Sequence, residues 1–561
     1  MAVPRQQMQK VLDLLARGQT GQARRLCQGL LFNRPGDVDA RHLLALVDLQ
    51  EGKPQAAAVS LEKLCREAPK NADLWRNLGV AELSCGNPDR ARESLEQGLA
   101  LAPKNAELAF NAGVAAAAGG DRAAARSYYE RAVELQPRLN AARNNLGALL
   151  VKEGEYGAAL PHLEAATATP GAPDIAHCNH ANALERVNRL DEAVAALARV
   201  RDGARPEPTL VGARLARRRG QPEQALARLR AFLAKPTGGI DAGTLGDLWQ
   251  QVALSADLVG DHAAVLPAAA KAKERWRQLA PEVDGAEYLE HLAALGRTAE
   301  LPRLAPGEGS AELPAGLVFF VGFPRSGTTL MENLLAADPG VRTTAEADYL
   351  HSAIGDLALA ESVRRDDLLA ARKQYLDNLR ADCHRDRPDW SALIVVDKLP
   401  LNIVYGRWID VLFPEAKLLV ALRDPRDAVL SCLLQRFRPN PAMRNLDSLA
   451  AAAKLYRRAM ELWLEARDGL EIPWLEYRYE DLAGDSGETL KQVLEFVGLE
   501  ADPLVLDARR QSQGVVVQTP SYERVAEAID TSAVARWRNY ATDFTAVHDD
   551  IAPFLEAFAY E

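Results

Sequence analysis

Residues 317–330 read LVFFVGFPRSGTTL, and this stretch decides the fold of the second half of the chain. The apolar run 317–321 predicts a buried strand, and residues 330–335 continue as a helical pattern. Between them lies a loop that contains Gly322 and Gly327. Where such a loop opens a helix, its backbone N–H groups and the helix dipole favour an anion. The stretch therefore predicts an α/β domain with a phosphate-binding loop.

The loop has the glycine spacing of a Walker A motif, but Thr328 occupies the position of the motif's lysine. The positive charge stands three positions earlier, at Arg325. Without a lysine that reaches the β- and γ-phosphates, hydrolysis of ATP is not expected. A nucleotide kinase or NTPase stays open as an alternative, and so does a non-enzymatic scaffold that keeps a vestigial nucleotide domain.

Two further apolar stretches end in a basic residue. Residues 417–422 run into Arg423, and a helix starting after Pro425 would bring Ser431 back beside the strand end. An arginine with a hydroxyl suits a terminal phosphate. Asp424 and Asp427 are expected to pair with the arginines around them.

The other stretch ends at Lys398. Strand ends in open α/β sheets point toward the ligand crevice. We therefore expect Lys398 to place positive charge there, with Asp397 able to orient it. A solvated lysine at a strand end is the alternative.

The first half of the chain repeats with a period of 34 residues. Three series share this spacing: Pro35, Pro69, Pro103 and Pro137; Gly18, Gly52, Gly86, Gly120 and Gly154; and Ala23, Ala57, Ala91, Ala125, Ala159 and Ala193. Glycine suits the turn between two helices, alanine permits their close approach, and proline ends the second helix. Leu78-Gly79, Ala112-Gly113 and Leu146-Gly147 mark the tightly packed first helix. The pattern resembles the tetratricopeptide repeat family.

The chain of 561 residues is too long for one core, which rarely exceeds about 250–300 residues. We expect an all-α helical solenoid over residues 1–280 and a proline- and glycine-rich linker over 281–314. An α/β, P-loop-like domain with a central, mostly parallel sheet is expected over 315–561. Solenoids present concave grooves that capture peptides or partner proteins. A spacer or dimerisation arm is the alternative reading of the array.

The composition narrows the classes of function. The net charge of −10 argues against a nucleic-acid binder. Residues 311–561 hold 28 basic and 40 acidic side chains, so an anionic ligand there needs a local basic pocket. The six cysteines are scattered without a CxxC pair, so no disulfide framework and no metal site are expected. With no signal peptide and no long apolar segment, we expect a cytoplasmic protein that does not enter a membrane.

Both phosphate motifs resemble those of sulfotransferases. Residues 323–329 resemble that family's 5′-phosphosulfate loop, and residues 422–431 resemble its 3′-phosphate motif. Residues 519–522 and 536–540 look like its C-terminal cofactor segment. The likeness covers about 316–545 and is greatest for the tyrosylprotein sulfotransferase branch and for bacterial repeat-fused sulfotransferases.

The resemblance implies a sulfotransferase that uses 3′-phosphoadenosine 5′-phosphosulfate (PAPS) as donor and needs no metal. The acceptor would be a hydroxyl, such as a protein or peptide tyrosine presented by the repeats; a carbohydrate, lipid or small phenolic acceptor is the alternative. Arg325 would stabilise the leaving phosphate, and Lys398 the transferring sulfuryl group. The donor-binding residues implied are Arg325, Ser326, Gly327, Thr328, Thr329, Arg423, Ser431, Tyr479, Ser521 and Arg536.

The general base is expected to be Glu346, which lies near the place where the tyrosylprotein branch carries its glutamate. A phenol has a pKa of about 10 and a glutamate about 4.3, so proton transfer must come late in the reaction. The tyrosylprotein branch usually has two adjacent glutamates, whereas Ala347 follows here. His351 is the rival base, since the small-molecule branch uses histidine. A merely structural Glu346 is the other alternative.

Overall fold

The structure is a computed structural model of the chain. It describes residues 5–169, 171–201, 205–235, 238–295, 301–309, 312–344, 346–355, 357–360, 362–484, 486–500 and 531–560. The chain forms two compact units, residues 1–202 and 203–561, which are described separately. The domain limits at 280 and 314 stay a proposal, because the compact units divide between 202 and 203 instead.

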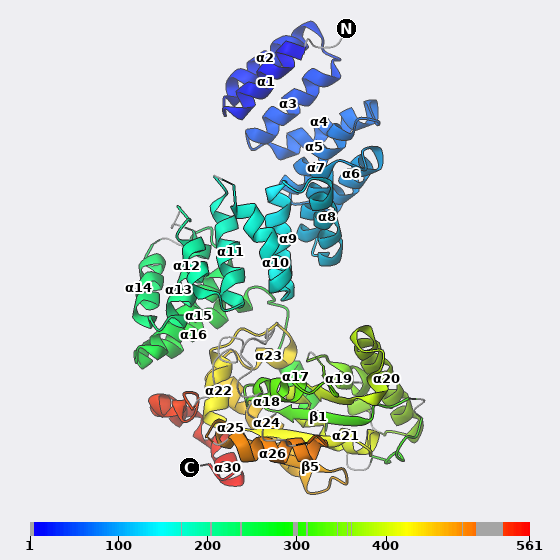
Figure 1. Cartoon of the computed structure of the whole chain (residues 1–561), viewed down its shortest axis with the longest axis vertical. Coiled ribbons are helices and arrows are strands. Elements are labelled where there is room, and N and C mark those ends of the chain that lie inside the picture. Colours follow the sequence, from blue (N-terminus) through cyan, green and yellow to red (C-terminus); the bar gives the residue numbers. More distant parts are fainter. Residues whose placement is uncertain are drawn as a thin grey trace. The chain divides into compact units, whose positions relative to one another are not determined.

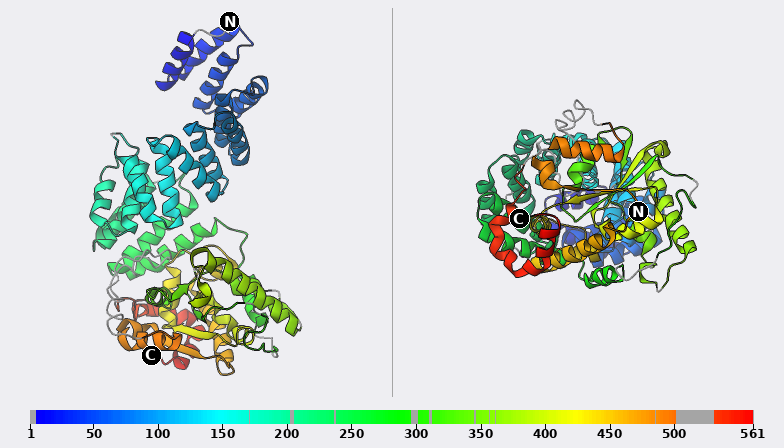
Figure 2. Two further views of the ribbon diagram at one scale, coloured as in Figure 1. Left: turned by 45° about the vertical axis from the view of Figure 1, so that its right-hand side comes forward. Right: turned by 90° about the horizontal axis from the view of Figure 1, so that it is seen from below.

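The first unit is a helical solenoid of successive helix pairs, drawn from blue to cyan in Figures 1 and 2. Its helices are α1 (Arg5–Ala16), α2 (Thr20–Asn33), α3 (Val38–Gln50), α4 (Pro54–Glu67), α5 (Ala72–Ser84), α6 (Pro88–Leu101), α7 (Ala106–Ala118), α8 (Arg122–Leu135), α9 (Asn140–Glu153), α10 (Tyr156–Thr167), α11 (Asp174–Arg186) and α12 (Leu190–Leu197). The four prolines of the repeat each lie two residues beyond the last residue of a second helix, as predicted.

The turn within each pair explains the periodic glycine. All five of these glycines have a left-handed backbone, with φ between 70° and 84°. A Cβ on Gly18, Gly52, Gly86 or Gly120 would meet no atom within 4 Å, so the backbone conformation and not crowding selects glycine there. Asn188 continues the series 34 residues after Gly154, with φ 63°. Asparagine is among the residues that tolerate this conformation best.

A second glycine position is selected by crowding. Gly147 of α9 packs against α10, where a Cβ would lie 2.5 Å from Leu163 Cγ. Gly79 and Gly113 face Leu95 and Tyr129 in the same way. The sequence prediction of a tightly packed first helix is confirmed.

Replacing Gly147 with alanine is expected to destabilise the first unit. Overpacking a core costs about 1–3 kcal/mol, which the better helix propensity of alanine reduces by about 1 kcal/mol. Gly157→Ala in α10 is the matched control, because a Cβ there meets nothing within 4 Å. Thermal unfolding of both variants checks the account. Equal stability of the two would show that the contact with Leu163 does not limit this position.

The second unit combines the helices α13 to α16 with an α/β domain. Its elements are α13 (Pro206–Arg218), α14 (Pro222–Leu233), α15 (Ala242–Leu258), α16 (His262–Arg277), α17 (Ala286–Leu295), β1 (Gly316–Gly322), α18 (Thr328–Ala336), β2 (Val341–Thr343), α19 (Tyr349–Ile354), η1 (Leu357–Leu359), α20 (Arg365–Asp386), η2 (Trp390–Ala392), β3 (Ile394–Lys398), η3 (Pro400–Tyr405), α21 (Gly406–Leu412), β4 (Lys417–Leu422), α22 (Pro425–Leu433), α23 (Pro441–Arg444), α24 (Leu449–Arg467), β5 (Trp474–Arg478), α25 (Tyr479–Gly484), α26 (Ser486–Val497), η4 (Arg536–Tyr540), α29 (Ala541–Phe544), η5 (Thr545–Val547) and α30 (His548–Ala557).

The five strands form one parallel sheet in the order β2-β3-β1-β4-β5. Alternate residues of β1 face opposite sides: Phe319 and Val321 join a core with α20, α21 and α24, whereas Val318 and Phe320 join a core with α18 and α26. From β1 the chain runs to β2 and back to β3 on one side of β1, and then crosses to β4 on its other side, so the carboxyl ends of β3, β1 and β4 surround a switch point. Ligands of open α/β sheets bind at such a point.

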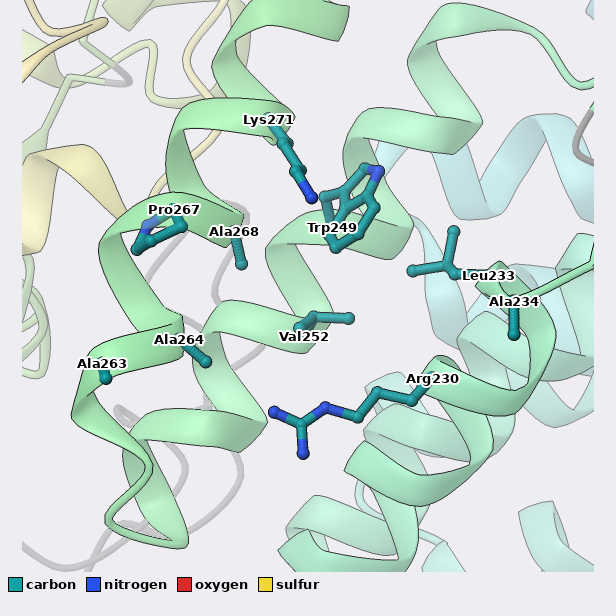
Figure 3. Close-up of a pocket in the computed structure, with 10 residues that line it drawn as sticks. All are labelled: Arg230, Leu233, Ala234, Trp249, Val252, Ala263, Ala264, Pro267, Ala268 and Lys271. Atoms are coloured by element: carbon teal, nitrogen blue, oxygen red, sulfur yellow. The ribbon is translucent and has the colours of Figure 1, made fainter.

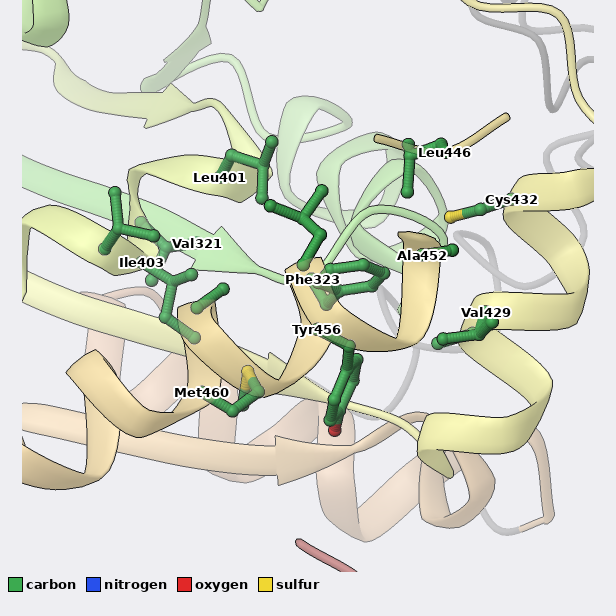
Figure 4. Close-up of a cluster of buried hydrophobic side chains, with 14 of the residues drawn as sticks. Val321, Phe323, Leu401, Ile403, Val429, Cys432, Leu446, Ala452, Tyr456 and Met460 are labelled. Carbon is green, nitrogen blue, oxygen red and sulfur yellow. The ribbon is translucent and has the colours of Figure 1, made fainter. Parts of the chain in front are cut away.

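The phosphate loop is anchored in the larger core. Phe323, the first residue after β1, is 1% exposed and packs edge-on against Tyr456 of α24, with ring centroids 4.8 Å apart. Figure 4 shows Phe323 among Val429 and Cys432 of α22. The base of the loop is therefore fixed by aromatic and aliphatic packing.

Helices α15 and α16 belong to the body of the α/β domain. Lys273 of α16 donates from Nζ to the Cys432 carbonyl oxygen at 3.2 Å, at the end of α22. Burial lowers the pKa of Lys273 to about 8. Gln250 of α15 donates to the Leu434 carbonyl at 2.9 Å. Helices α15 and α16 thus supply hydrogen-bond donors to carbonyl groups at the end of α22, the helix that carries Ser431.

A groove of about 360 Å³ opens between α14, α15 and α16. Trp249, Val252 and Leu233 line its apolar part, and Figure 3 shows Arg230 and Lys271 at its borders. The Lys271 ammonium lies 4.1 Å from the centre of the Trp249 ring. Arg230 is paired with Asp261 at 2.6 Å.

Within the described residues, no helix has the length and apolar character needed to cross a membrane.

Candidate active site

The phosphate loop leaves β1 at Gly322 and enters α18 at Thr328, as the sequence predicts. Gly327 caps the helix with φ 85°, and a Cβ at this position would collide with the Tyr479 ring. Ser326, Thr328 and Thr329 are buried at the start of α18. The loop thus turns the N-terminal end of a helix toward the switch point of the sheet.

Arg325 links the two sequence motifs. Its Nε donates to Ser431 Oγ at 3.1 Å, and its carbonyl oxygen accepts from Arg423 Nη1 at 2.7 Å. Arg423 follows β4 directly, and Ser431 comes from α22, which begins at Pro425 as predicted. The structure therefore brings Arg325, Arg423 and Ser431 together from three parts of the fold.

Tyr479 completes this side of the site. It is the first residue after β5, and the Arg423 guanidinium lies 4.7 Å from the centre of its ring. Arg423 is 6% exposed, and its Nη2 donates to the Ala533 carbonyl at 2.7 Å. Its Nε is buried without a hydrogen-bond partner. A buried N–H group of this kind can donate a hydrogen bond to an anionic ligand at little further desolvation cost.

Asp424 and Asp427 take different roles. Asp424 pairs with Arg426 at 2.6 Å and caps α22 by accepting from the Arg426 N–H, so its prediction is confirmed. Asp427 accepts from the Trp537 N–H at 2.7 Å. Burial raises the pKa of Asp427 to about 6, and Arg423 opposes this shift. Both carboxylates therefore fix backbone segments near Arg423 by hydrogen bonds.

Lys398 lies at the carboxyl end of β3 between two carboxylates. Its Nζ contacts Glu346 Oε1 and lies 3.0 Å from Glu332 Oε2. The side chain of Lys398 is 1% exposed and that of Glu332 is 13% exposed, whereas that of Glu346 is 40% exposed. A carboxylate within reach of solvent therefore stands beside a buried ammonium.

The prediction that Asp397 orients the Lys398 side chain is wrong. Asp397 is fully buried and accepts from Thr344 Oγ1 at 3.0 Å and from Tyr375 Oη at 2.8 Å. Neighbouring residues of a strand face opposite sides, which separates the two side chains. Asp397 acts on the backbone instead, because Thr344 Oγ1 also accepts from the Lys398 N–H at 3.1 Å. Burial raises the pKa of Asp397 to about 6.

Arg325 and Glu346 share an unusual backbone conformation. Among the described residues, five that are not glycine have a positive φ, and these two are among them, with φ 74° and 53°. Such a conformation costs on the order of 1–3 kcal/mol and is concentrated at functional sites. Neither value could be predicted from the sequence.

The remaining candidates have other surroundings. Arg536 of η4 is paired with Asp257 of α15 at 2.5 Å. His351 of α19 lies with its Nδ1 2.6 Å from Tyr405 Oη, which also lies 2.7 Å from His291 Nε2. Ser521 lies outside the described residues.

Two residues of the site carry no sequence signal. Glu332 stands in the apolar pattern of α18, where a solvent-facing glutamate is the ordinary expectation. Asp257 belongs to the repeats and approaches Arg536 only in the folded chain.

The described residues fit a nucleotide that carries phosphates at both ends. Gly327 lets the Tyr479 ring lie against the phosphate loop, and Arg325 and Arg423 supply two positive charges. No group of three or more His, Cys, Asp or Glu arranged for a metal ion is found in the part of the chain that the structure describes.

Comparisons with known proteins agree with this geometry. Residues 318–503 match the model of the sulfotransferase family, and residues 8–72, 48–110 and 110–173 match models of the tetratricopeptide repeat. An uncharacterized protein of Aquifex aeolicus is 26% identical over 48% of this chain and 37% of its own length.

Two further relatives are named protein-tyrosine sulfotransferases. That of Drosophila melanogaster is 26% identical over 45% of this chain and 52% of its own length. Protein-tyrosine sulfotransferase 2 of Gallus gallus is 24% identical over 45% of this chain and 71% of its own length. The chain thus spans about a third of the length of the Aquifex aeolicus protein and about half of the length of the Drosophila melanogaster protein. It carries tetratricopeptide repeats in its N-terminal half and a sulfotransferase domain in its C-terminal part.

Proposed function

We propose that the protein transfers a sulfuryl group from PAPS to an acceptor hydroxyl. The observation that carries the proposal is the contact of Arg325 with both Ser431 and Arg423. This contact joins the loop that resembles a 5′-phosphosulfate site to the motif that resembles a 3′-phosphate site. A donor with phosphate groups at both ends of its nucleoside matches such a pair of subsites.

In the proposed reaction, the acceptor oxygen attacks the sulfur and its proton passes to a Glu346 carboxylate oxygen. A new bond forms between the acceptor oxygen and the sulfur, and the bond from the sulfur to the bridging phosphate oxygen breaks. The electron pair stays on the leaving adenosine 3′,5′-bisphosphate. Arg325 and Lys398 provide fixed positive charge for the leaving phosphate and the transferring group, which is how preorganised sites lower a barrier.

Glu346 suits the role of base because it is the accessible member of its cluster. Its side chain is 40% exposed, so an acceptor hydroxyl can reach it from solvent. Its present partner, Lys398, is the residue proposed to act on the sulfuryl group. An arriving acceptor would therefore exchange one hydrogen bond of Glu346 for another. The Ser326, Gly327, Thr328 and Thr329 backbone, with Tyr479, Ser521 and Arg536, belongs to the proposed donor site.

The acceptor proposed is a tyrosine of a protein or peptide. The support is that two relatives are named protein-tyrosine sulfotransferases, together with the presence of tetratricopeptide repeats, a class that generally mediates protein–protein interaction. The groove beside Trp249 and Lys271 offers apolar surface and a positive charge to such a partner (Figure 3). A cytoplasmic location, suggested by six cysteines that are scattered without a CxxC pair, is part of the same proposal.

A transfer assay tests the proposal. The full chain is incubated with PAPS labelled at its sulfur and with two peptides that differ only in tyrosine or phenylalanine. Label on the tyrosine peptide alone is expected. Label only on a saccharide, lipid or simple phenol would leave sulfotransfer standing and overturn the tyrosine acceptor. No transfer to any acceptor, by protein that also fails to bind adenosine 3′,5′-bisphosphate, would overturn the function.

A further inference from the structure

Glu332 stands next to the proposed catalytic residues without a role in the reaction described so far. Its Oε2 lies 3.0 Å from Lys398 Nζ, and its side chain is 13% exposed. It also forms a side-chain hydrogen bond with Thr343, at the end of β2. Glu332 is thus a partly buried carboxylate held by two neighbouring strand ends.

The position of Glu332 on α18 ties it to the phosphate loop. Residues three and four apart share one face of a helix, so Glu332 lies on the same face as Thr329 and Thr328. These two threonines form the start of the helix at the loop. The ammonium of Lys398 is therefore held by the same helix whose first turn faces the proposed donor.

The charges around Lys398 change during the proposed reaction. Before transfer, its ammonium faces Glu346 from the loop after β2 and Glu332 from α18, with Asp397 preceding it on β3. When Glu346 accepts the acceptor's proton, that carboxylate becomes neutral. An ammonium that is 1% exposed would then lack a counter-charge if Glu346 were its one partner, and a buried unpaired charge is strongly disfavoured.

We propose that Glu332 is a positioning residue that keeps Lys398 charged and in place at the end of β3 while Glu346 takes up the proton. This inference rests on the proposed function. Burial raises the pKa of Glu332, and the positive charge of Lys398 opposes that shift. Each group of the pair therefore stabilises the charged form of the other. Glu332 needs no contact with donor or acceptor for this role.

Glu332→Gln in the full chain tests the role, because glutamine keeps the shape and removes the charge. A 10- to 100-fold fall in kcat is expected, about the value of one charge-assisted hydrogen bond, with the KM for PAPS nearly unchanged. The alkaline side of the rate profile is expected to move to lower pH, because the loss of Glu332 makes the charged ammonium less favourable. Glu332→Asp is expected to restore part of kcat and of the profile.

The matched control is Glu465→Gln, which changes an exposed glutamate of α24. Unfolding temperature and affinity for adenosine 3′,5′-bisphosphate are measured for every variant. If Glu332→Gln binds the bisphosphate and keeps the wild-type kcat and pH profile, the inference is overturned and the proposed function stands. If the glutamine variant does not fold, Glu332→Met, which also removes the charge, takes its place, and a wild-type kcat and pH profile in that variant overturns the inference equally. Failure of the wild-type chain to bind or transfer would count against the proposed function itself.

Discussion

Replacing Glu346 with glutamine is expected to lower the rate of sulfuryl transfer by about 10²–10⁴-fold, the usual contribution of a general base. Affinity for adenosine 3′,5′-bisphosphate is expected to stay unchanged, because Glu346 contacts Lys398 at the end of β3, whereas Arg423 follows β4. Single-turnover kinetics and calorimetry, made on the same preparation, separate the two quantities.

His351→Asn is the comparison that decides between the two candidate bases. His351 is hydrogen-bonded to Tyr405, and we expect this variant to keep the transfer rate within a few-fold of wild type. A full rate for Glu346→Gln together with a large loss for His351→Asn would reverse the assignment. An equal loss of bisphosphate affinity and of rate in Glu346→Gln would place Glu346 in the donor site instead.

Arg423→Ala is expected to weaken binding of adenosine 3′,5′-bisphosphate by about 10- to 150-fold. The variant removes the positive charge of a side chain that is 6% exposed. It also removes the Nη1 group that donates to the Arg325 carbonyl oxygen. Arg423→Lys keeps the charge but not the planar fork, so an intermediate loss is expected. Isothermal titration calorimetry gives the three affinities.

The control for this series is Arg385→Ala, which changes an arginine of α20 whose side chain is 74% exposed. It is expected to bind the bisphosphate as wild type does. Wild-type affinity in Arg423→Ala, in protein that unfolds at the wild-type temperature, would remove Arg423 from the donor site.

The parts predicted well from the sequence are those encoded by short-range pattern. The strand, loop and helix around Arg325 lie within one stretch, and local periodicity decides each element. Ser431 follows the same logic, because it lies eight positions after Arg423 and the first two turns of α22 return it to the strand end. The 34-residue period likewise reflects local turns. Asn188 shows that the turn keeps its positive φ even where asparagine replaces glycine.

The parts that the sequence does not yield depend on contacts between distant segments. Glu332 and Lys398 are 66 positions apart, and their pairing depends on how α18 packs beside β3. Asp397 shows the opposite failure, since adjacency in sequence suggested an action on Lys398 that the alternation of a strand forbids. Asp257 approaches Arg536 because α15 packs with the α/β domain, which no local pattern reports.

The most direct measurement of the central claim is a calorimetric titration of the full chain with adenosine 3′,5′-bisphosphate. Adenosine 5′-monophosphate, which lacks the 3′-phosphate, and ATP with magnesium serve as comparisons. The account predicts tight binding of the bisphosphate, at least about 10-fold weaker binding of the monophosphate, and loss of this difference in Arg423→Ala. Equal affinity for bisphosphate and monophosphate, or a preference for ATP with magnesium, would contradict it.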